Sequence, residues 1–196
     1  GYSMAHIGIN AKENPNTFSN ILVYANISVA PTQPSIVIYN GQNIKVYNNT
    51  FYGCNQNSDA FNGQLYLHGK THDCEIKNNI FYNNNDFSRN SYWPCIYSTF
   101  ETDFESVDVD YNLYYIADQD NMLFNLQGNG GPYYDYEWDS YLNTIGWDAN
   151  SQEPQDPLFV SSTDYRLKEG SPAIGEGLDV GLEYDYMGNF FNSPPT

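Results

Sequence analysis

Four segments of the chain repeat one pattern of hydrophobic and polar positions. Each has an apolar residue, a second apolar residue two positions later, and an asparagine five positions after the first. Such alternation is typical of a strand with one buried face, and the asparagine marks a turn whose backbone groups its amide can satisfy. The segments begin at Ile21, Ile44, Cys74 and Val107 and reach Asn26, Asn49, Asn79 and Asn112. Four such turns in one register predict stacked coils.

A second alternating pattern lies between these segments. Its equivalent apolar residues are 29, 29, 31 and 27 positions apart, at Ile7, Ile36, Leu65, Ile96 and Leu123. A period of this length indicates a repeat architecture, and the segments lack the three-and-four spacing that helical repeats need. The sequence therefore predicts an all-β solenoid, a parallel β-helix of about five coils, each burying its inner face against its neighbours.

The repeat stops at residue 127, before the chain-breaking run Gly128-Asn129-Gly130-Gly131-Pro132. Asp135 is expected to cap a short helix that covers the last coil, since Trp138, Tyr141 and Leu142 would share one face. With 196 residues and 40% apolar content, the chain can bury one sizeable core. We expect a single domain with coils over 1–127, a loop and helix over 128–155, and a capping tail over 156–196.

The charge of the chain limits its partners. Seven Lys and Arg stand against 24 Asp and Glu, a formal net charge of −17. This charge repels phosphate backbones and anionic membrane surfaces. No apolar run reaches the length of a membrane span, and the start Gly1-Tyr2-Ser3-Met4 is not that of a signal segment. We expect neither nucleic acid nor membrane as a partner, and any export signal to lie outside this sequence.

The cysteines do not predict a metal site. Cys54, Cys74 and Cys95 leave at least one thiol unpaired, and Cys74 occupies a core position of the repeat. Their spacings match no CxxC or Cys/His pattern, so no zinc site is expected. Their redox states stay open.

The outer face of the first predicted sheet gathers aromatic and ionisable residues. Outward neighbours are about 7 Å apart along a strand and about 4.8 Å apart between coils, so these side chains form one patch. Tyrosine rings offer flat apolar faces to sugar rings, and a histidine of pKa near 6.5 is largely neutral at working pH. The predicted substrate-binding residues are Tyr39, Tyr66 and Tyr97; His68 is the general base, Lys70 the charge stabiliser, and Glu101 its orienting partner or the acid. The alternative is a surface Lys70–Glu101 ion pair beside a solvated histidine.

No cofactor is required by these residues, although calcium is possible. Asp59 and Asp103 are expected in adjacent loops, where they could form a carboxylate pair or bind Ca²⁺. The preference of aspartate for turns explains them equally well.

The C-terminal segments resemble those of bacterial right-handed parallel β-helix proteins of the pectate-lyase-like superfamily. The resemblance lies in Asp156-Pro157-Leu158-Phe159-Val160, in Asp164-Tyr165-Arg166-Leu167, in Gly170-Ser171-Pro172-Ala173-Ile174-Gly175, and in rungs such as Lys77-Asn78-Asn79-Ile80-Phe81-Tyr82. It implies a right-handed coil and a bacterial protein that is secreted or on the cell surface. Family members usually begin with a capping helix and further coils, which this sequence lacks. We expect missing sequence, another chain or end-to-end contact to cover the first coil.

Three classes of function remain, because this superfamily includes lyases, hydrolases, epimerases and spikes. The favoured one is an extracellular polysaccharide lyase or glycoside hydrolase acting on a plant, algal or microbial glycan. The others are a noncatalytic module that binds a polysaccharide or oligosaccharide, and a structural or adhesive spike or filament. Elimination needs a base and a cation, whereas hydrolysis needs paired carboxylates. The sequence does not select the sugar.

Overall fold

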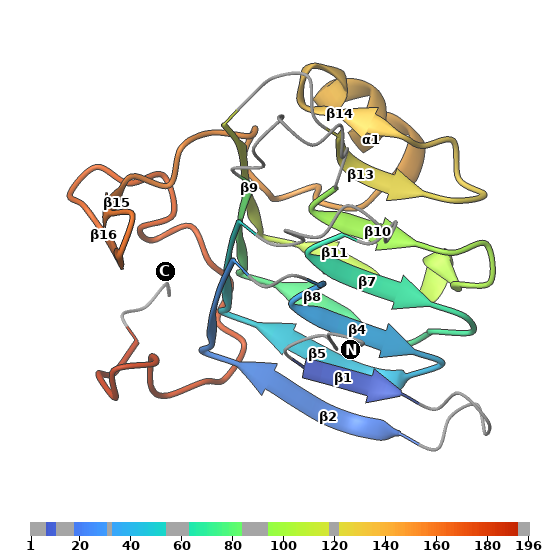
Figure 1. The fold of residues 1–196 in the computed structure, drawn as a ribbon, viewed down its shortest axis with the longest axis horizontal. Helices are drawn as coiled ribbons and strands as arrows, with labels where there is room; N and C mark the ends of the chain where they lie inside the picture. The colour runs from blue at the N-terminus through green and yellow to red at the C-terminus, as the bar shows by residue number, and fades with distance from the viewer. Residues whose placement is uncertain are drawn as a thin grey trace.

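The coils stack along one axis, so that their strands form three sheets that enclose the core (Figure 1). The computed structural model describes residues 7–10, 18–30, 33–53, 63–83, 94–117 and 122–191. The predicted all-β parallel β-helix is confirmed. Sheet A contains β1 (Ile7–Asn10), β4 (Ile36–Tyr39), β7 (Leu65–His68), β10 (Ile96–Ser98), β13 (Met122–Leu126) and the antiparallel β14 (Tyr133–Tyr134).

The other two sheets complete each coil. Sheet B contains β2 (Ser19–Tyr24), β5 (Gln42–Tyr47), β8 (Glu75–Lys77) and β11 (Asp108–Asp110). Sheet C contains β3 (Ile27–Val29), β6 (Thr50–Tyr52), β9 (Ile80–Asn83) and β12 (Leu113–Ile116). The chain therefore passes from sheet A to sheet B to sheet C in every complete coil.

The stack is shorter than predicted. Four strands in sheet B or sheet C make three steps from coil to coil, so the helix has about three turns instead of five coils. Among the described residues, the fifth coil contributes only β13, whose next neighbour is the antiparallel β14. The sequence count followed the strands of one sheet, and the fifth of these has no counterparts in the other two.

The predicted register holds except at the last coil. Ile7 pairs with Ile36, Ile36 with Leu65, and Leu65 with Ile96. Ile96 then pairs with Phe124, so the predicted equivalence with Leu123 is wrong by one residue. Leu123 and Phe124 are both buried, at 1% and 0% exposure, and two adjacent buried residues erase the alternation on which the prediction depended.

The asparagine ladder joins the coils at the turn between sheets B and C. In the interior of the ladder, the Asn49 backbone N–H and side-chain amide both donate to Asn79 Oδ1, at 3.1 and 3.0 Å. Asn79 repeats this geometry toward Asn112 at 2.9 and 3.0 Å. The stacking of the four asparagines is thus confirmed, with Asn26 donating to Asn49 in the same way.

Each ladder asparagine follows a residue in the left-handed region. Asn48 has φ 51° and Asn78 has φ 57°, which asparagine tolerates better than most residues. Ala25 and Tyr111 adopt the same conformation, at φ 52° and 56°. This sharp turn directs the following asparagine inward, where its amide bonds carbonyl groups on its own coil and on the preceding one.

The ladder ends on a buried aspartate. Asn112 donates to Asp148 Oδ1 at 3.4 Å, and Ser151 donates to the same oxygen at 2.6 Å. The hydroxyls of Tyr114 and Tyr141 also donate to the Asp148 carboxylate. Burial raises the pKa of Asp148 to about 7, although the four donors oppose this shift. A single carboxylate thus ends the ladder.

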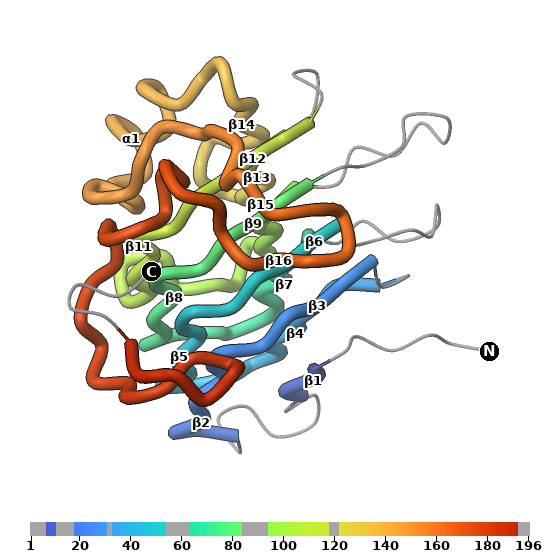
Figure 2. The backbone as a smooth tube through the Cα atoms, turned by 90° about the vertical axis from the view of Figure 1, so that its left-hand side faces the viewer, coloured from blue at the N-terminus to red at the C-terminus, as the bar shows by residue number. Residues whose placement is uncertain are grey.

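The C-terminal region covers the stack on two sides. Helix α1 (Trp138–Ile145) is present as predicted, with Trp138 and Tyr141 buried. Asp135 is not its cap, because a short 3-10 turn over Asp135–Glu137 precedes the helix and the Asp135 carboxylate accepts the Tyr136 N–H. The tail then crosses sheet C with the hairpin of β15 (Phe159–Ser161) and β16 (Asp164–Leu167) (Figure 2). Its rings pack on Tyr52 and Tyr82.

Replacing a central ladder residue, Asn79→Ala, should lower the free energy of unfolding by about 1–3 kcal/mol. The variant removes donors to Val46 O and Lys77 O and leaves the Asn49 amides without their acceptor. Urea denaturation measures the change, with Asn143→Ala as the control because Asn143 is an exposed helical asparagine. A loss no larger than that of the control would show that the ladder contributes nothing to stability.

Asp148→Asn should remove part of the pH dependence of stability. The folded-state pKa of about 7 exceeds the ordinary 3.8, so the protonated carboxyl stabilises the fold fully below about pH 4. That contribution disappears as the pH rises through about 7, and three pKa units correspond to roughly 4 kcal/mol. The measurement is the difference in unfolding free energy between the two proteins from pH 4 to 8. Parallel curves would contradict the prediction.

Candidate functional site

The predicted patch lies on the outer face of sheet A, in the predicted register. Tyr66 pairs with Tyr97 on the next coil, and Tyr39 pairs with His68. Because paired residues on parallel strands point to the same side, these four side chains share one face. The row containing Tyr66 and Tyr97 continues to Asn125 on β13.

Ring contacts join the four residues into one cluster, which we call the sheet A ring cluster (Tyr39, Tyr66, His68 and Tyr97). The Tyr39 and His68 ring centroids are 4.1 Å apart, and those of Tyr66 and His68 are 5.0 Å apart. Tyr66 meets Tyr97 edge-on at 5.1 Å. His68 is therefore held between two tyrosine rings.

One ring nitrogen of His68, Nδ1, is buried. Among the described residues it has no hydrogen-bond partner. Nε2 is therefore the nitrogen available to a ligand. Burial lowers the pKa of His68 below 6.5, while the Glu101 carboxylate acts in the opposite direction. The imidazole is accordingly neutral at neutral pH, as a general base must be.

The charged residues of the patch lie on turns at the edge of sheet A. Lys70 and Glu101 are both exposed, and the ion pair proposed as their alternative role is not formed in the described part of the chain. The Lys70 backbone N–H donates to Asn40 Oδ1 at 2.7 Å, which fixes its turn to the preceding coil. Both charged side chains are therefore exposed on the turns that follow β7 and β10, and the Glu101 charge acts on His68.

The tyrosines differ in accessibility. Tyr97 is only 7% exposed, so its ring offers little open surface, whereas Tyr39 and Tyr66 are half-buried. Burial, with smaller effects from Tyr97 and Tyr39, raises the pKa of Tyr66 to about 12. Its hydroxyl stays protonated and can donate a hydrogen bond.

One exposed aromatic residue at this edge was not predicted. Phe100 precedes Glu101 and is 73% exposed. A side-chain carbon on Gly128 would come within 3.0 Å of its ring, so the next turn of the edge lies close beside it. Alternation could not identify Phe100, because β10 ends at Ser98 and the two-residue period ends with it.

The structure adds nothing in favour of calcium. Asp59 lies outside the described residues, and Asp103 is exposed with its backbone N–H donating to Thr71 O. Across the described ranges, no three His, Cys, Asp or Glu residues are grouped to hold a metal ion. In the same part of the chain, no helix is long and apolar enough to cross a membrane.

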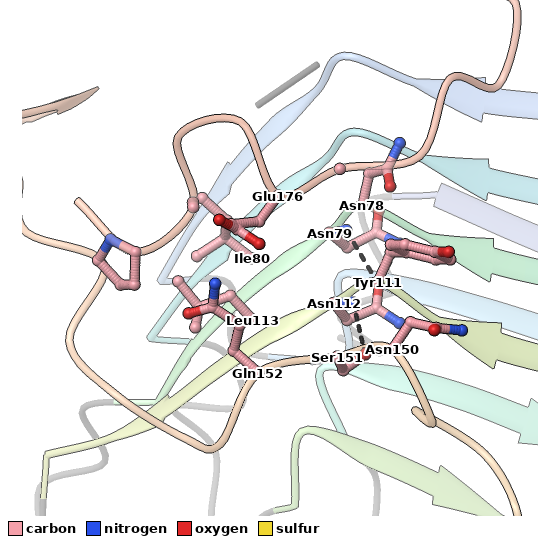
Figure 3. A pocket seen from close by; sticks show the side chains of 13 residues that line it. Asn78, Asn79, Ile80, Tyr111, Asn112, Leu113, Asn150, Ser151, Gln152 and Glu176 are labelled. Carbon is pink, nitrogen blue, oxygen red and sulfur yellow. Dashed lines mark hydrogen bonds between the residues drawn. The ribbon is translucent and has the colours of Figure 1, made fainter. Parts of the chain in front are cut away.

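Two hollows lie away from sheet A. One, beside the asparagine ladder, has a volume of about 30 Å³, room for little more than water (Figure 3). It is bordered by Asn78, Gln152 and Glu176. The other, about 220 Å³, lies between Tyr52, Tyr82 and the tail. The first cannot admit a sugar ring.

The chain has no match among models of known protein families, curated proteins or solved structures.

A titration of His68 tests the geometry directly. Its pKa, followed by NMR of the ring protons, should lie below 6.5 because the ring is partly buried. Glu101→Gln should lower it further, since the carboxylate stabilises the imidazolium. Asp103→Asn is the control, because Asp103 is an exposed carboxylate on the same turn. A His68 pKa that does not respond to Glu101→Gln would show that the two side chains do not interact and would contradict the prediction.

Proposed function

We propose that this chain is an extracellular, polysaccharide-active β-helix protein that binds an extended glycan over the outer face of sheet A. The observation that carries the proposal is the sheet A ring cluster, with neutral His68 between Tyr39 and Tyr66. Aromatic faces suit the apolar faces of sugar rings, and coils about 4.8 Å apart suit an extended polymer. The exposed Phe100 adds a further aromatic surface.

Of the two cleavage reactions, the patch favours elimination over hydrolysis. His68 Nε2 would take the proton from the carbon that bears the uronate carboxylate. The electrons of that C–H bond would form a C=C bond as the glycosidic C–O bond on the neighbouring carbon breaks, and the leaving oxygen would take up a proton from water. Lys70 would neutralise the carboxylate as charge builds on it. Hydrolysis would need a second carboxylate opposite Glu101. Among the described residues, Glu101 is the carboxylate whose charge acts on His68, which supports a lyase over a glycoside hydrolase.

The resemblance of the tail and rungs to pectate-lyase-like β-helix proteins supports the same proposal, along with a secreted or surface location in a bacterium. The resemblance supports a shared fold more strongly than a shared reaction, because members of that superfamily catalyse several different reactions. A noncatalytic glycan-binding module uses the same rings without cleavage. A structural or adhesive spike uses neither the rings nor His68.

A panel of polysaccharides tests the proposal. Polyuronates and neutral glycans, with and without calcium, are assayed for unsaturated products and for new reducing ends. We expect unsaturated products, reduced more than a hundredfold by His68→Ala and about tenfold by Tyr66→Ala. His72→Ala is the matched control, because His72 is also partly buried on a turn but pairs with Asp73 at 2.9 Å.

The other outcomes select among the classes. New reducing ends without unsaturation would indicate a hydrolase, and binding that Tyr66→Ala weakens without turnover would indicate a binding module. A chain that neither binds nor cleaves any glycan would leave the structural spike.

A further inference from the structure

The C-terminal tail and the asparagine turns enclose a groove on the side of the molecule formed by sheet C. Its volume is about 530 Å³, within the range of ~300–1,000 Å³ typical of ligand sites. One wall is the turn that holds Ala25, Asn48 and Thr50, and the other is the tail with Tyr186 and Phe190. The two walls are far apart in sequence and meet because the tail runs back along the stack (Figure 2).

The groove has fixed walls. The Asn78 side chain exchanges two hydrogen bonds with the Leu178 backbone, at 2.7 and 2.8 Å, which attaches the tail to the ladder turn. Beyond it, Tyr184 and Phe190 form an antiparallel bridge, and the Asp185 carboxylate accepts N–H groups from Met187 and Asn189 across the intervening loop. The loop that lines the groove is therefore closed by its own hydrogen bonds.

The tail leaves large apolar side chains exposed at this groove. Tyr186 is 49% exposed, Met187 59%, Phe190 73% and Ile174 47%. A tail that served only to cover sheet C would bury such residues, as it does Phe159 at 8%. Clustered exposed apolar side chains are typical of an interaction site.

The charged side chains that line the groove already have partners within the chain. Of the described residues that line it, Arg166 and Asp185 are the charged ones. Arg166 binds Asp164 through Nε at 2.9 Å and Nη2 at 2.5 Å, and Asp185 is satisfied by the loop. An anionic ligand would find no unpaired cation among these residues, because Arg166 is already bound to Asp164.

We infer that the groove binds a neutral saccharide, at a site separate from sheet A. A sugar ring has an apolar C–H face for Tyr186 and Phe190, and hydroxyls for the polar side chains of Thr50 and Asn189. A purely apolar ligand would bury these polar groups, together with the Arg166–Asp164 pair, without replacing their water. The inference does not depend on catalysis at His68.

Titration calorimetry of the full chain with a neutral hexasaccharide of β-linked glucose or xylose tests the site. Tyr186→Ala and Phe190→Ala should each weaken binding at least tenfold. Tyr136→Ala should not weaken binding. Tyr136 is a 72% exposed tyrosine in the 3-10 turn that precedes α1, and it does not line the groove. The calorimetry is repeated in a Tyr66→Ala background, where any binding at sheet A is weakened. Binding that remains there and is lost on adding Tyr186→Ala reports the groove alone, so failure at sheet A and failure at the groove are distinguishable.

Three results would overturn the inference. The first is no binding of either neutral hexasaccharide to the wild-type chain. The second is binding that Tyr186→Ala and Phe190→Ala do not change while circular dichroism shows that both remain folded. The third is Tyr186-dependent binding of a galacturonate hexasaccharide or of an apolar dye in preference to the neutral sugar.

Discussion

The fold depends on hydrogen bonds that each coil can complete only with its neighbour. At the turn between sheets B and C, the Asn49 and Asn79 amides satisfy carbonyls of two coils and present an acceptor to the preceding coil. A buried amide without its partner costs about 1–3 kcal/mol, so one coil removed from the stack is penalised at every ladder position. The ladder therefore couples the coils into one cooperative unit.

Such a ladder needs a terminator, and Asp148 provides it. Its carboxylate accepts hydrogen bonds from Asn112, Ser151 and two tyrosine hydroxyls. The Asn112 side-chain amide therefore has an acceptor at the end of the ladder. The raised pKa is the consequence of placing an acceptor-rich group where burial disfavours its charge. Helix α1 supplies Tyr141 to this cluster, which makes the helix part of the termination and more than a cover.

Repetition explains which features could be predicted from the sequence. The ladder asparagines recur at one offset from alternating apolar residues, so their stacking could be predicted. The same alternation predicted that Tyr66 and His68 point to one face of sheet A. Asp148 occurs once and repeats nothing. The coil count was wrong because, among the described residues, the fifth strand of sheet A has no counterparts in sheets B and C. The shift at Phe124 was missed because the adjacent buried residues Leu123 and Phe124 hide the two-residue period.

The candidate site shows the corresponding limit. Alternation determines the face to which a side chain points, but its accessibility depends on the turns and on what lies over the sheet. Tyr97 points outward and is nevertheless buried, while Phe100 lies beyond the last strand residue and is exposed.

The turns also hold the site in place. The Asn40 side chain accepts a hydrogen bond from the Lys70 N–H, and the Thr99 hydroxyl accepts one from the Gly69 N–H at 2.9 Å. These bonds attach the turn after β7 to the coils on both sides of it. Lys70 and Glu101 thus have exposed side chains on anchored backbones. In the proposed site on sheet A, the β-helix supplies the spacing of His68 and the tyrosines, and the turns that follow β7 and β10 supply the charged side chains.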